Sequence, residues 1–483
     1  MKSIKKNYLY NLFYQILILV TPLITAPYLA RMLGADGIGN VSYAEAVVSY
    51  FVLFATMGTT TFGQREISYV QDKKEKRTQI FWETCILEAF TVSIVLICYL
   101  VFAFRQNQAA LYLVLVFNIL SVLANVTWFF QGIEEFGKIV FRNTVFKVIN
   151  IAYVFLFIKS KEDVVWYLFG ASFFSFLSNV SLWFFLPKYI GKPDWKSLKP
   201  FRHMKTIVSL FIPTVAIQVY TVLDKVMIGR ITQDVFENGY YEQAVNISKM
   251  VLTLVTALGT VMVPRIGYYF EKKEYEEVKK LMYKSYRFVW FLGVPLCFGL
   301  IIVSSNFVPW FFGEGYDKVI PLLKILSLLI LSIGISNVTG ILYLIPTKKQ
   351  NILTVTVAVG AIVNFILNLV LIRHFSSIGA AIASVTAETI IAIVQLIIVR
   401  KQFSLWKVLC EGKHYFIAGI VMLVSLSFIE NKLSPSIFHT MLLILCGGVM
   451  YIGVLVLFKD EFLFSNISRV LERLKFVKNM IKK

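Results

Sequence analysis

The stretch PLITAPYLARMLGADGIGNVSYAEAVVSYF, residues 22–51, joins two long apolar segments through a short connection. The first segment runs near 8–30 and the second near 39–61, so each reaches the roughly 20 residues that an α-helix needs to cross a bilayer. The connection contains Arg31, Gly34 and Asp36, whose types suit a loop outside the hydrocarbon. This stretch therefore predicts two consecutive membrane-spanning helices.

The composition of the whole chain extends this prediction. Of its 483 residues, 58% are hydrophobic and only 16% are charged, whereas soluble domains have about a quarter charged residues. A soluble enzyme and a disordered tail protein are excluded, and we predict an all-α polytopic membrane protein. Apolar runs between charged, Gly and Pro positions predict fourteen spans, near 8–30, 39–61, 80–103, 110–131, 143–158, 165–187, 206–229, 244–264, 288–308, 319–345, 351–372, 377–399, 415–429 and 437–458.

The distribution of basic residues predicts the orientation. Of the 48 Lys and Arg, 36 fall on the side of the N-terminus, 8 on the opposite side and 4 within the spans. The positive-inside rule therefore places both termini in the cytoplasm. This asymmetry accounts for the net charge of +20 without a nucleic-acid partner. The loops on the outer side are short, so we expect no large external domain.

Several kinds of chemistry have no motif in the chain. Its five cysteines are scattered without C-x-x-C spacing, which predicts neither a disulfide framework nor a zinc site. No G-x-x-x-x-G-K-[ST] motif for nucleotide phosphates and no G-x-S-x-G motif for acyl transfer occurs. We therefore expect a protein that is not an enzyme and that has no cofactor or metal.

An internal repeat appears at an offset of 200 residues. GNVSYA at 39–44 matches GYYEQA at 239–244, and Arg65 and Arg265 follow the two copies at the same distance. Because the copies lie six spans apart, spans 1–6 and 7–12 should form two bundles related by a pseudo-two-fold axis along the membrane normal. We expect an N-terminal lobe at 1–190, a C-terminal lobe at 206–400, and a region at 401–483 with the last two spans and a cytoplasmic amphipathic tail.

Polar residues recur at helical spacing inside several spans, where a lipid-facing position would be costly for them. These stripes are Ser42, Glu45, Ser49, Thr56 and Thr60 in span 2; Asn118, Ser121 and Asn125 in span 4; Asn143, Lys147 and Asn150 in span 5; Thr214, Gln218, Thr221 and Lys225 in span 7; Asn246, Lys249, Thr253, Thr256 and Thr260 in span 8; and Asn364, Asn368, Ser384, Glu388 and Gln395 in spans 11 and 12. Such stripes predict a cavity or contacts between helices.

The lysines within the spans favour a cavity. A buried Lys costs about 3 kcal/mol on insertion scales, and Lys147, Lys225 and Lys249 lie too deep to reach the headgroups easily. They predict a hydrated central cavity lined by cations. The alternative is a static ion pair, in which Lys225 or Lys249 pairs with Asp224 or Glu45.

The chain resembles the multidrug/oligosaccharidyl-lipid/polysaccharide exporter superfamily, and within it the polysaccharide transporters, or Wzx-type flippases. The opening stretch at 22–51 is similar to the first signature of the family. The passages LDKVMIGR at 223–230, GYYEQAVNI at 239–247 and VPRI at 263–266 resemble the second signature. The resemblance implies two six-helix lobes around a cavity that moves an undecaprenyl-pyrophosphate-linked oligosaccharide from the inner to the outer leaflet by alternating access, for capsule or O-antigen-type polymers.

By this resemblance the cavity should be cationic, and the matching residues here are Arg31, Lys147, Lys225, Arg230 and Lys249. Lys and Arg neutralise a pyrophosphate, while amides such as Gln218 bind sugar hydroxyls. The expected partners are the lipid-linked oligosaccharide, membrane lipids, a polysaccharide polymerase and assembly proteins.

Coupling to an ion is a separate hypothesis. Without a nucleotide site, net flipping must draw on an ion gradient or on removal of the product, and H⁺ and Na⁺ are the candidate ions. A carboxylate within a span would bind the ion, and the candidates are Glu45, Asp224 and Glu388.

Two other functions are weighed. A cation or drug antiporter of the same superfamily would favour carboxylates in its cavity. A membrane polysaccharide polymerase would need larger external loops with Asp, Glu, Arg or His than this chain provides.

Overall fold

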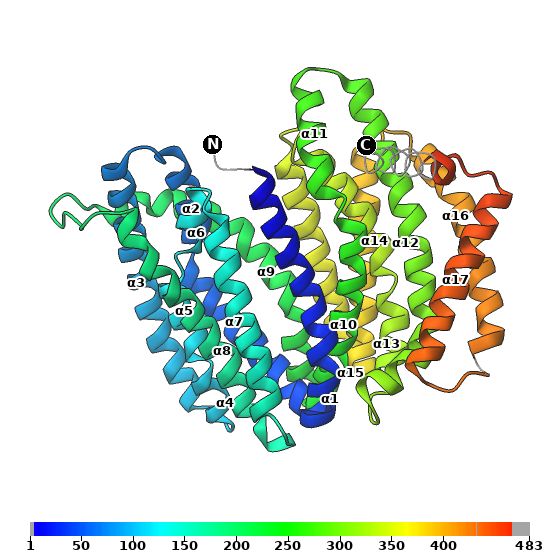
Figure 1. Cartoon of the computed structure of the whole chain (residues 1–483), viewed down its shortest axis with the longest axis horizontal. Coiled ribbons are helices and arrows are strands. Elements are labelled where there is room, and N and C mark those ends of the chain that lie inside the picture. The colour runs from blue at the N-terminus through cyan, green and yellow to red at the C-terminus, as the bar shows by residue number, and fades with distance from the viewer. Residues whose placement is uncertain (1–3, 431, 466–483) are drawn as a thin grey trace, which may run out of the picture. The chain divides into compact units, whose positions relative to one another are not determined.

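The computed structural model describes residues 4–430 and 432–465, and its regular elements over those residues are helices without any β-strand (Figure 1). The α-helices are α1 (Ile4–Thr56), α2 (Thr59–Tyr69), α3 (Lys74–Phe104), α4 (Ala109–Val114), α5 (Val116–Ala124), α6 (Thr127–Gly132), α7 (Phe136–Phe157), α8 (Val164–Ser181), α9 (Met204–Thr232), α10 (Val235–Thr256), α11 (Gly259–Glu271), α12 (Tyr275–Phe312), α13 (Val319–Leu326), α14 (Leu329–Asn337), α15 (Gln350–Ile398), α16 (Leu405–Glu430) and α17 (Ile437–Leu457).

The two longest helices each contain a sharp break. In α1 the break is at Gly34, whose φ of 72° is a left-handed conformation that glycine adopts without strain. In α15 it is at Ser376, with φ of 52°. The breaks fall between the predicted spans 8–30 and 39–61 and between 351–372 and 377–399, so each helix supplies two spans.

The fourth predicted span is divided into α4, α5 and α6. The break between α5 and α6 lies at Asn125, whose backbone is extended with ψ of 97°. Its side-chain Oδ1 accepts a hydrogen bond from the Thr127 amide at 3.0 Å. An Asn side chain that satisfies a nearby backbone donor offers an alternative to the helical hydrogen bond, which explains the interruption.

The predicted class of an all-α polytopic membrane protein is confirmed. Among the described residues, ten helical segments are long and apolar enough to cross a membrane. Two of them, at Val20–Tyr69 and Gln350–Ile398, have 50 and 49 residues, enough for two crossings each. The exact number of fourteen spans stays a prediction.

The chain forms two compact units, Met1–Glu242 and Gln243–Lys483. In the first, Tyr99 and Ile119 belong to a core that α3, α5 and α8 share. In the second, Trp290 of α12 packs with Tyr415 of α16 and Tyr451 of α17, so the last two spans lie in the same unit as α12. The boundary between the two compact units falls within α10, and the lobes expected at 1–190 and 206–400 stay a prediction. Residues 466–483 of the expected amphipathic tail lie outside the described residues.

Equivalent positions of the sequence repeat meet where the second half of α1 crosses the start of α10. A Cβ atom added to Gly39 would lie 1.7 Å from the carbonyl oxygen of Val235. One added to Gly239 would lie 2.0 Å from the carbonyl oxygen of Ala35. Both pairs are related by the offset of 200 residues, so the crossing is locally symmetric. Glycine at both positions lets the two backbones come this close.

Candidate polar cavity

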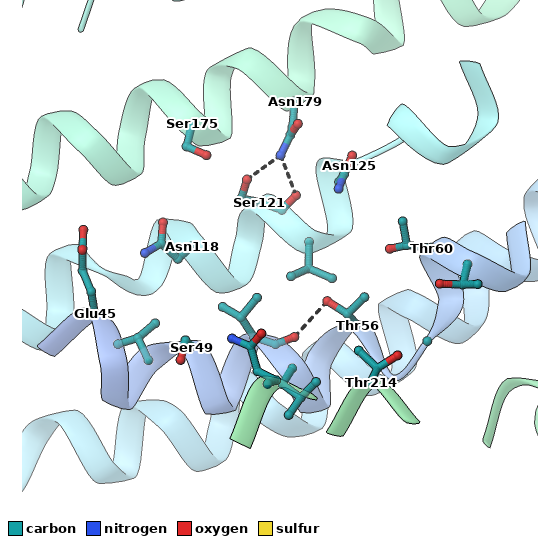
Figure 2. A pocket seen from close by; sticks show the side chains of 17 residues that line it. Glu45, Ser49, Thr56, Thr60, Asn118, Ser121, Asn125, Ser175, Asn179 and Thr214 are labelled. Atoms are coloured by element: carbon teal, nitrogen blue, oxygen red, sulfur yellow. Dashed lines mark hydrogen bonds between the residues drawn. The ribbon is translucent and has the colours of Figure 1, made fainter. Parts of the chain in front are cut away.

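A polar cavity of about 550 Å³ lies within the first unit, among helices that the sequence predicts to cross the membrane (Figure 2). Its polar lining residues are Glu45, Ser49, Thr56, Thr60, Thr61, Asn118, Ser121, Asn125, Ser175, Asn179, Thr214 and Gln218. The remaining lining residues are Val48, Val52, Leu53, Gly58 and Val122. Eleven of these seventeen lining residues therefore carry a hydroxyl or an amide group.

Three of the predicted stripes meet at this cavity. The stripe of span 2 lines it from the second half of α1 and from α2, and the stripe of span 4 lines it from α5 and the break that follows. From span 7, Thr214 and Gln218 line it on α9. Each stripe repeats every three or four residues, which aligns its side chains on one face of a helix.

A fourth wall is formed by α8, and we did not single out its residues from the sequence. Ser175 and Asn179 lie four residues apart on α8 and line the cavity. The Asn179 amide donates to Ser121 Oγ at 2.6 Å and to the Ser121 carbonyl oxygen at 3.2 Å, as Figure 2 shows. The four-residue spacing of Ser175 and Asn179 in the sixth predicted span is the sequence signal that could have identified them.

The side chain of Asn179 accepts a hydrogen bond from a buried arginine. Arg142 on α7 is 7% exposed, and its Nη1 donates to Asn179 Oδ1 at 2.6 Å and to the Ser178 carbonyl oxygen at 3.2 Å. Its Nη2 donates to Thr127 Oγ1 at 3.2 Å. Because the Asn179 oxygen is occupied by Arg142, its amide group is oriented toward Ser121. The sequence placed Arg142 in a cytoplasmic loop, so its role in supporting the wall was missed.

The hydroxyl groups on α1 and α9 mostly donate to the backbone of their own helix. Ser49 Oγ donates to Ala46 O at 2.7 Å, and Thr56 Oγ1 donates to Val52 O at 2.9 Å. Such a hydroxyl keeps lone pairs that can accept a further hydrogen bond. The cavity can thus accept hydrogen bonds from a hydroxyl-rich ligand through these oxygens and donate to it through amides.

The polar cavity lies within the first unit alone, so the cationic central cavity that we expected stays a prediction. Glu45 is the only charged residue among the lining residues named above. Arg31 and Arg230 are exposed and Lys147 is half-buried, and none of these three is among the lining residues. Lys249 is exposed and Glu388 half-buried in the second unit.

Lys225 forms an ion pair with Glu242, a partner that the sequence did not identify. Ser42 Oγ also donates to Glu242 Oε2, at 2.5 Å. Glu45 interacts electrostatically with both Lys225 and Glu242. The neighbouring Asp224 accepts a hydrogen bond from the Tyr241 hydroxyl at 2.6 Å. Ser42 and Glu242 are again separated by 200 residues, so the missed partner occupies the position equivalent to a stripe residue of span 2.

Comparison with protein families gives one match that covers more than half of the chain. Residues 4–270 match a family model described as "Polysaccharide biosynthesis protein". An Escherichia coli K12 protein whose name assigns it to O-antigen transport is 25% identical over 405 residues, which cover 82% of this chain and 97% of that protein. A Haloferax volcanii protein named for a flippase role in low-salt glycan biosynthesis is 23% identical over 375 residues, 74% of this chain and 75% of that protein.

Solved structures share the fold at low sequence identity. The lipid II flippase MurJ in an inward closed conformation has a TM-score of 0.72 at 16% identity, and the likeness covers 94% of this chain and 99% of that chain. An inward-facing multidrug resistance transporter of the MATE family and the MOP superfamily has a TM-score of 0.58 at 12% identity, covering 85% and 99% of the two chains. Both structures share the fold of this chain, which agrees with the predicted fold class.

Proposed function

The chain belongs to the polysaccharide biosynthesis protein family, and from this premise we propose that it is a flippase for a lipid-linked oligosaccharide. Its substrate is an undecaprenyl-pyrophosphate-linked repeat unit, which it moves from the inner to the outer leaflet of a bacterial cytoplasmic membrane. The translocated unit serves capsule or O-antigen-type assembly, in which a polysaccharide polymerase and assembly proteins act next. Its relatives are named for transport and flipping, and the protein acts as a transporter rather than an enzyme.

The observation that supports this proposal most is the chemistry of the polar cavity. A sugar has hydroxyl groups on all sides, and each loses its water when it enters the hydrocarbon region of a membrane. Twelve polar side chains around about 550 Å³ replace those hydrogen bonds. Eleven of the twelve are uncharged, which suits a neutral sugar better than an ion.

The pyrophosphate of the substrate needs positive charge elsewhere. We propose Arg31, Lys147, Lys225, Arg230 and Lys249 as its binding residues, with Gln218 on the sugar. Lys225 has Glu242 as its partner in the present structure. The Lys225 ammonium has three N–H donors and can be shared between Glu242 and a phosphate oxygen, so the affinity for the substrate should depend on the charge of Glu242.

Net transport by alternating access draws on a gradient of H⁺ or Na⁺. We propose Glu45, Asp224 and Glu388 as coupling residues. Among them, Glu45 lines the cavity and interacts electrostatically with the Lys225–Glu242 pair. A change in the charge of Glu45 therefore alters the electrostatic potential both in the cavity and at this pair.

A cation antiporter of the same superfamily is the second candidate, and one observation favours it. Glu45 supplies a carboxyl group to the cavity, and no Lys or Arg is among the lining residues. Efflux of a cationic dye from proteoliposomes that depends on Glu45 would support this function, whereas the flippase predicts no such efflux.

The flippase is tested by deleting the gene in its host and restoring it with variants. Deletion should cause the lipid-linked oligosaccharide to accumulate in the inner leaflet, and the wild-type chain should clear it. Asn118→Ala combined with Asn179→Ala should fail to clear it, because two amides of the lining are lost.

Ser93→Ala is the matched control for that pair of variants. Ser93 is exposed on α3 and its hydroxyl donates to Ala89 O at 2.7 Å, away from the cavity. This variant should restore transport fully. Normal transport by the double amide variant at equal membrane abundance would refute the role of the cavity.

A further inference from the structure

The segment that follows residue 188 is attached to α3 by hydrogen bonds. We call residues 189–203 the strap. Several hydrogen bonds join α3 side chains to the backbone of the strap, among them Arg77 Nη2 to Tyr189 O at 2.6 Å, Gly191 N–H to Thr78 Oγ1 at 2.9 Å, Trp82 Nε1 to Gly191 O at 3.3 Å, and Gln79 Nε2 to Ser197 O at 3.4 Å. The strap therefore has a defined path across the end of α3.

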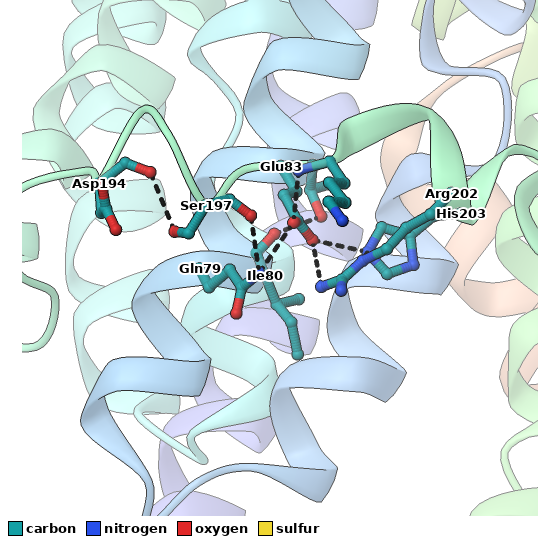
Figure 3. Close-up of polar contacts among 9 residues, drawn as sticks. Gln79, Ile80, Glu83, Asp194, Ser197, Arg202 and His203 are labelled. Carbon is teal, nitrogen blue, oxygen red and sulfur yellow. Dashed lines mark hydrogen bonds and ion pairs between the residues drawn. The ribbon is translucent and has the colours of Figure 1, made fainter.

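Glu83 of α3 fixes the far end of the strap, as Figure 3 shows. Its side chain is 0% exposed and accepts hydrogen bonds from Arg202 Nη2 at 2.6 Å and from the Lys199 backbone amide at 2.8 Å. His203 Nε2 lies 2.8 Å from the same carboxylate. A buried carboxylate with this many donors is a strong structural anchor.

An apolar groove lies beside the strap on the first unit. Two adjoining cavities of about 500 Å³ and 450 Å³ share Trp82 and Trp183. The larger is lined by Cys85, Ile86, Ala89, Leu120, Leu123, Ala124, Phe176, Val180 and Trp195, and the smaller by Leu186, Pro187, Ile190, Gly191, Lys192 and Pro193. Apart from Lys192 and the indole nitrogens, this lining offers no polar side chain to a ligand beyond a thiol.

Positive charge concentrates on the strap and its flanks. Residues 188–205 contain Lys188, Lys192, Lys196, Lys199, Arg202 and Lys205 against Asp194. Lys192 and Lys196 are exposed, and Trp195 between them is 69% exposed. Tryptophan is enriched where a membrane meets water, and basic residues near the cytoplasmic leaflet attract anionic headgroups.

We propose that this groove binds an anionic phospholipid of the inner leaflet. One acyl chain occupies the groove beside Trp82 and Trp183, and the headgroup phosphate pairs with Lys192 and Lys196. An amphiphile with an alkyl chain and a negative headgroup matches both parts of the site, whereas a zwitterionic lipid matches the groove alone. The strap leads directly into α9, so the lipid stabilises the connection between the sixth and seventh predicted spans.

The test uses the intrinsic fluorescence of the full-length protein. We would reconstitute it in vesicles of equimolar phosphatidylglycerol and phosphatidylcholine, with bromine on the acyl chains of one lipid at a time. Brominated phosphatidylglycerol should quench tryptophan fluorescence more strongly than brominated phosphatidylcholine. Trp195→Phe should reduce the difference, because Trp195 lines the groove.

Charge reversal identifies the headgroup site. Lys192→Glu combined with Lys196→Glu should lower the preference for phosphatidylglycerol at least about fivefold, since each basic residue near a membrane surface contributes strongly to anionic binding. The matched control, Lys272→Glu with Lys273→Glu, changes two exposed lysines between α11 and α12 and should leave the preference unchanged.

Three results would overturn the proposal. Equal quenching by the two lipids means ordinary lipid contact without a site. Equal loss in the control variant means unspecific surface charge. Loss of the phosphatidylglycerol preference on adding one equivalent of a polyprenyl phosphate assigns the groove to the lipid carrier of the substrate instead.

Discussion

At the scale of single residues, the Lys225–Glu242 pair is the clearest charged contact near the polar cavity. The side chains are 21% and 18% exposed, so each charge is largely removed from solvent. Opening such a pair leaves a buried charge without its partner, which is far more costly than replacing both members. Neutralising one member of the pair should therefore lower the stability of the protein, whereas neutralising both together should have little effect.

We expect Glu242→Gln to lower the stability by about 3 kcal/mol, because Lys225 then loses the carboxylate of its ion pair. Lys225→Met should have a similar effect, whereas the double variant should unfold close to the wild-type temperature. Thermal unfolding in detergent micelles measures all three. Additive losses in the double variant would show that the two residues do not act as a pair.

The support of Asn179 by Arg142 gives a second prediction at this scale. Arg142→Lys keeps the charge but cannot donate to Asn179 Oδ1, Ser178 O and Thr127 Oγ1 together, because Lys lacks the planar fork. Transport of the lipid-linked oligosaccharide should fall about tenfold, equivalent to roughly 1.4 kcal/mol. The protein should remain inserted at normal abundance. Wild-type transport by Arg142→Lys would show that the orientation of Asn179 is unimportant.

At the scale of secondary-structure elements, the crossing of α1 and α10 depends on the absence of side chains at Gly39 and Gly239. At each of these glycines, backbone atoms of the other helix occupy the space that the methyl group of an alanine would need. Helix crossings of this kind use small residues because close approach replaces the hydrophobic driving force that is missing within a membrane.

Gly39→Ala tests this crossing. The added Cβ would meet the Val235 carbonyl oxygen at 1.7 Å, so the helices must separate, and we expect a loss of at least about 1–3 kcal/mol in stability. Gly448→Ala on α17 is the control, since no atom lies within 4 Å of its added Cβ. Unfolding temperatures of the two variants in the same detergent give the comparison. Equal temperatures would contradict the close approach.

At the scale of the whole molecule, the predicted topology follows from the count of basic residues in the loops. In a background without the native cysteines, of which Cys98 and Cys410 are exposed, single cysteines can be placed at exposed loop positions. An impermeant thiol reagent should label cysteines at Asn107 and Asp317 from outside, and those at Lys196 and Lys273 only after the membrane is opened. Labelling of all four from one side would refute the arrangement of spans.

The sequence alone was sufficient to predict the helical membrane class, the breaks near Gly34 and Ser376, and three of the four walls of the polar cavity. These features depend on local properties: the length of apolar runs, glycine and charge between them, and polar residues every three or four positions. Thr56, Asn118 and Gln218 are examples, because helical spacing alone puts them on a polar face.

Only the tertiary structure identified Glu242 as the partner of Lys225 and Arg142 as the support of Asn179. It also placed α16 and α17 in one unit with α12. Each of these contacts depends on how one helix is rotated against another, which the period of a single helix does not specify. A charged residue in a span predicts that an oppositely charged or polar partner lies nearby. Which residue is that partner depends on the packing between segments far apart in the chain.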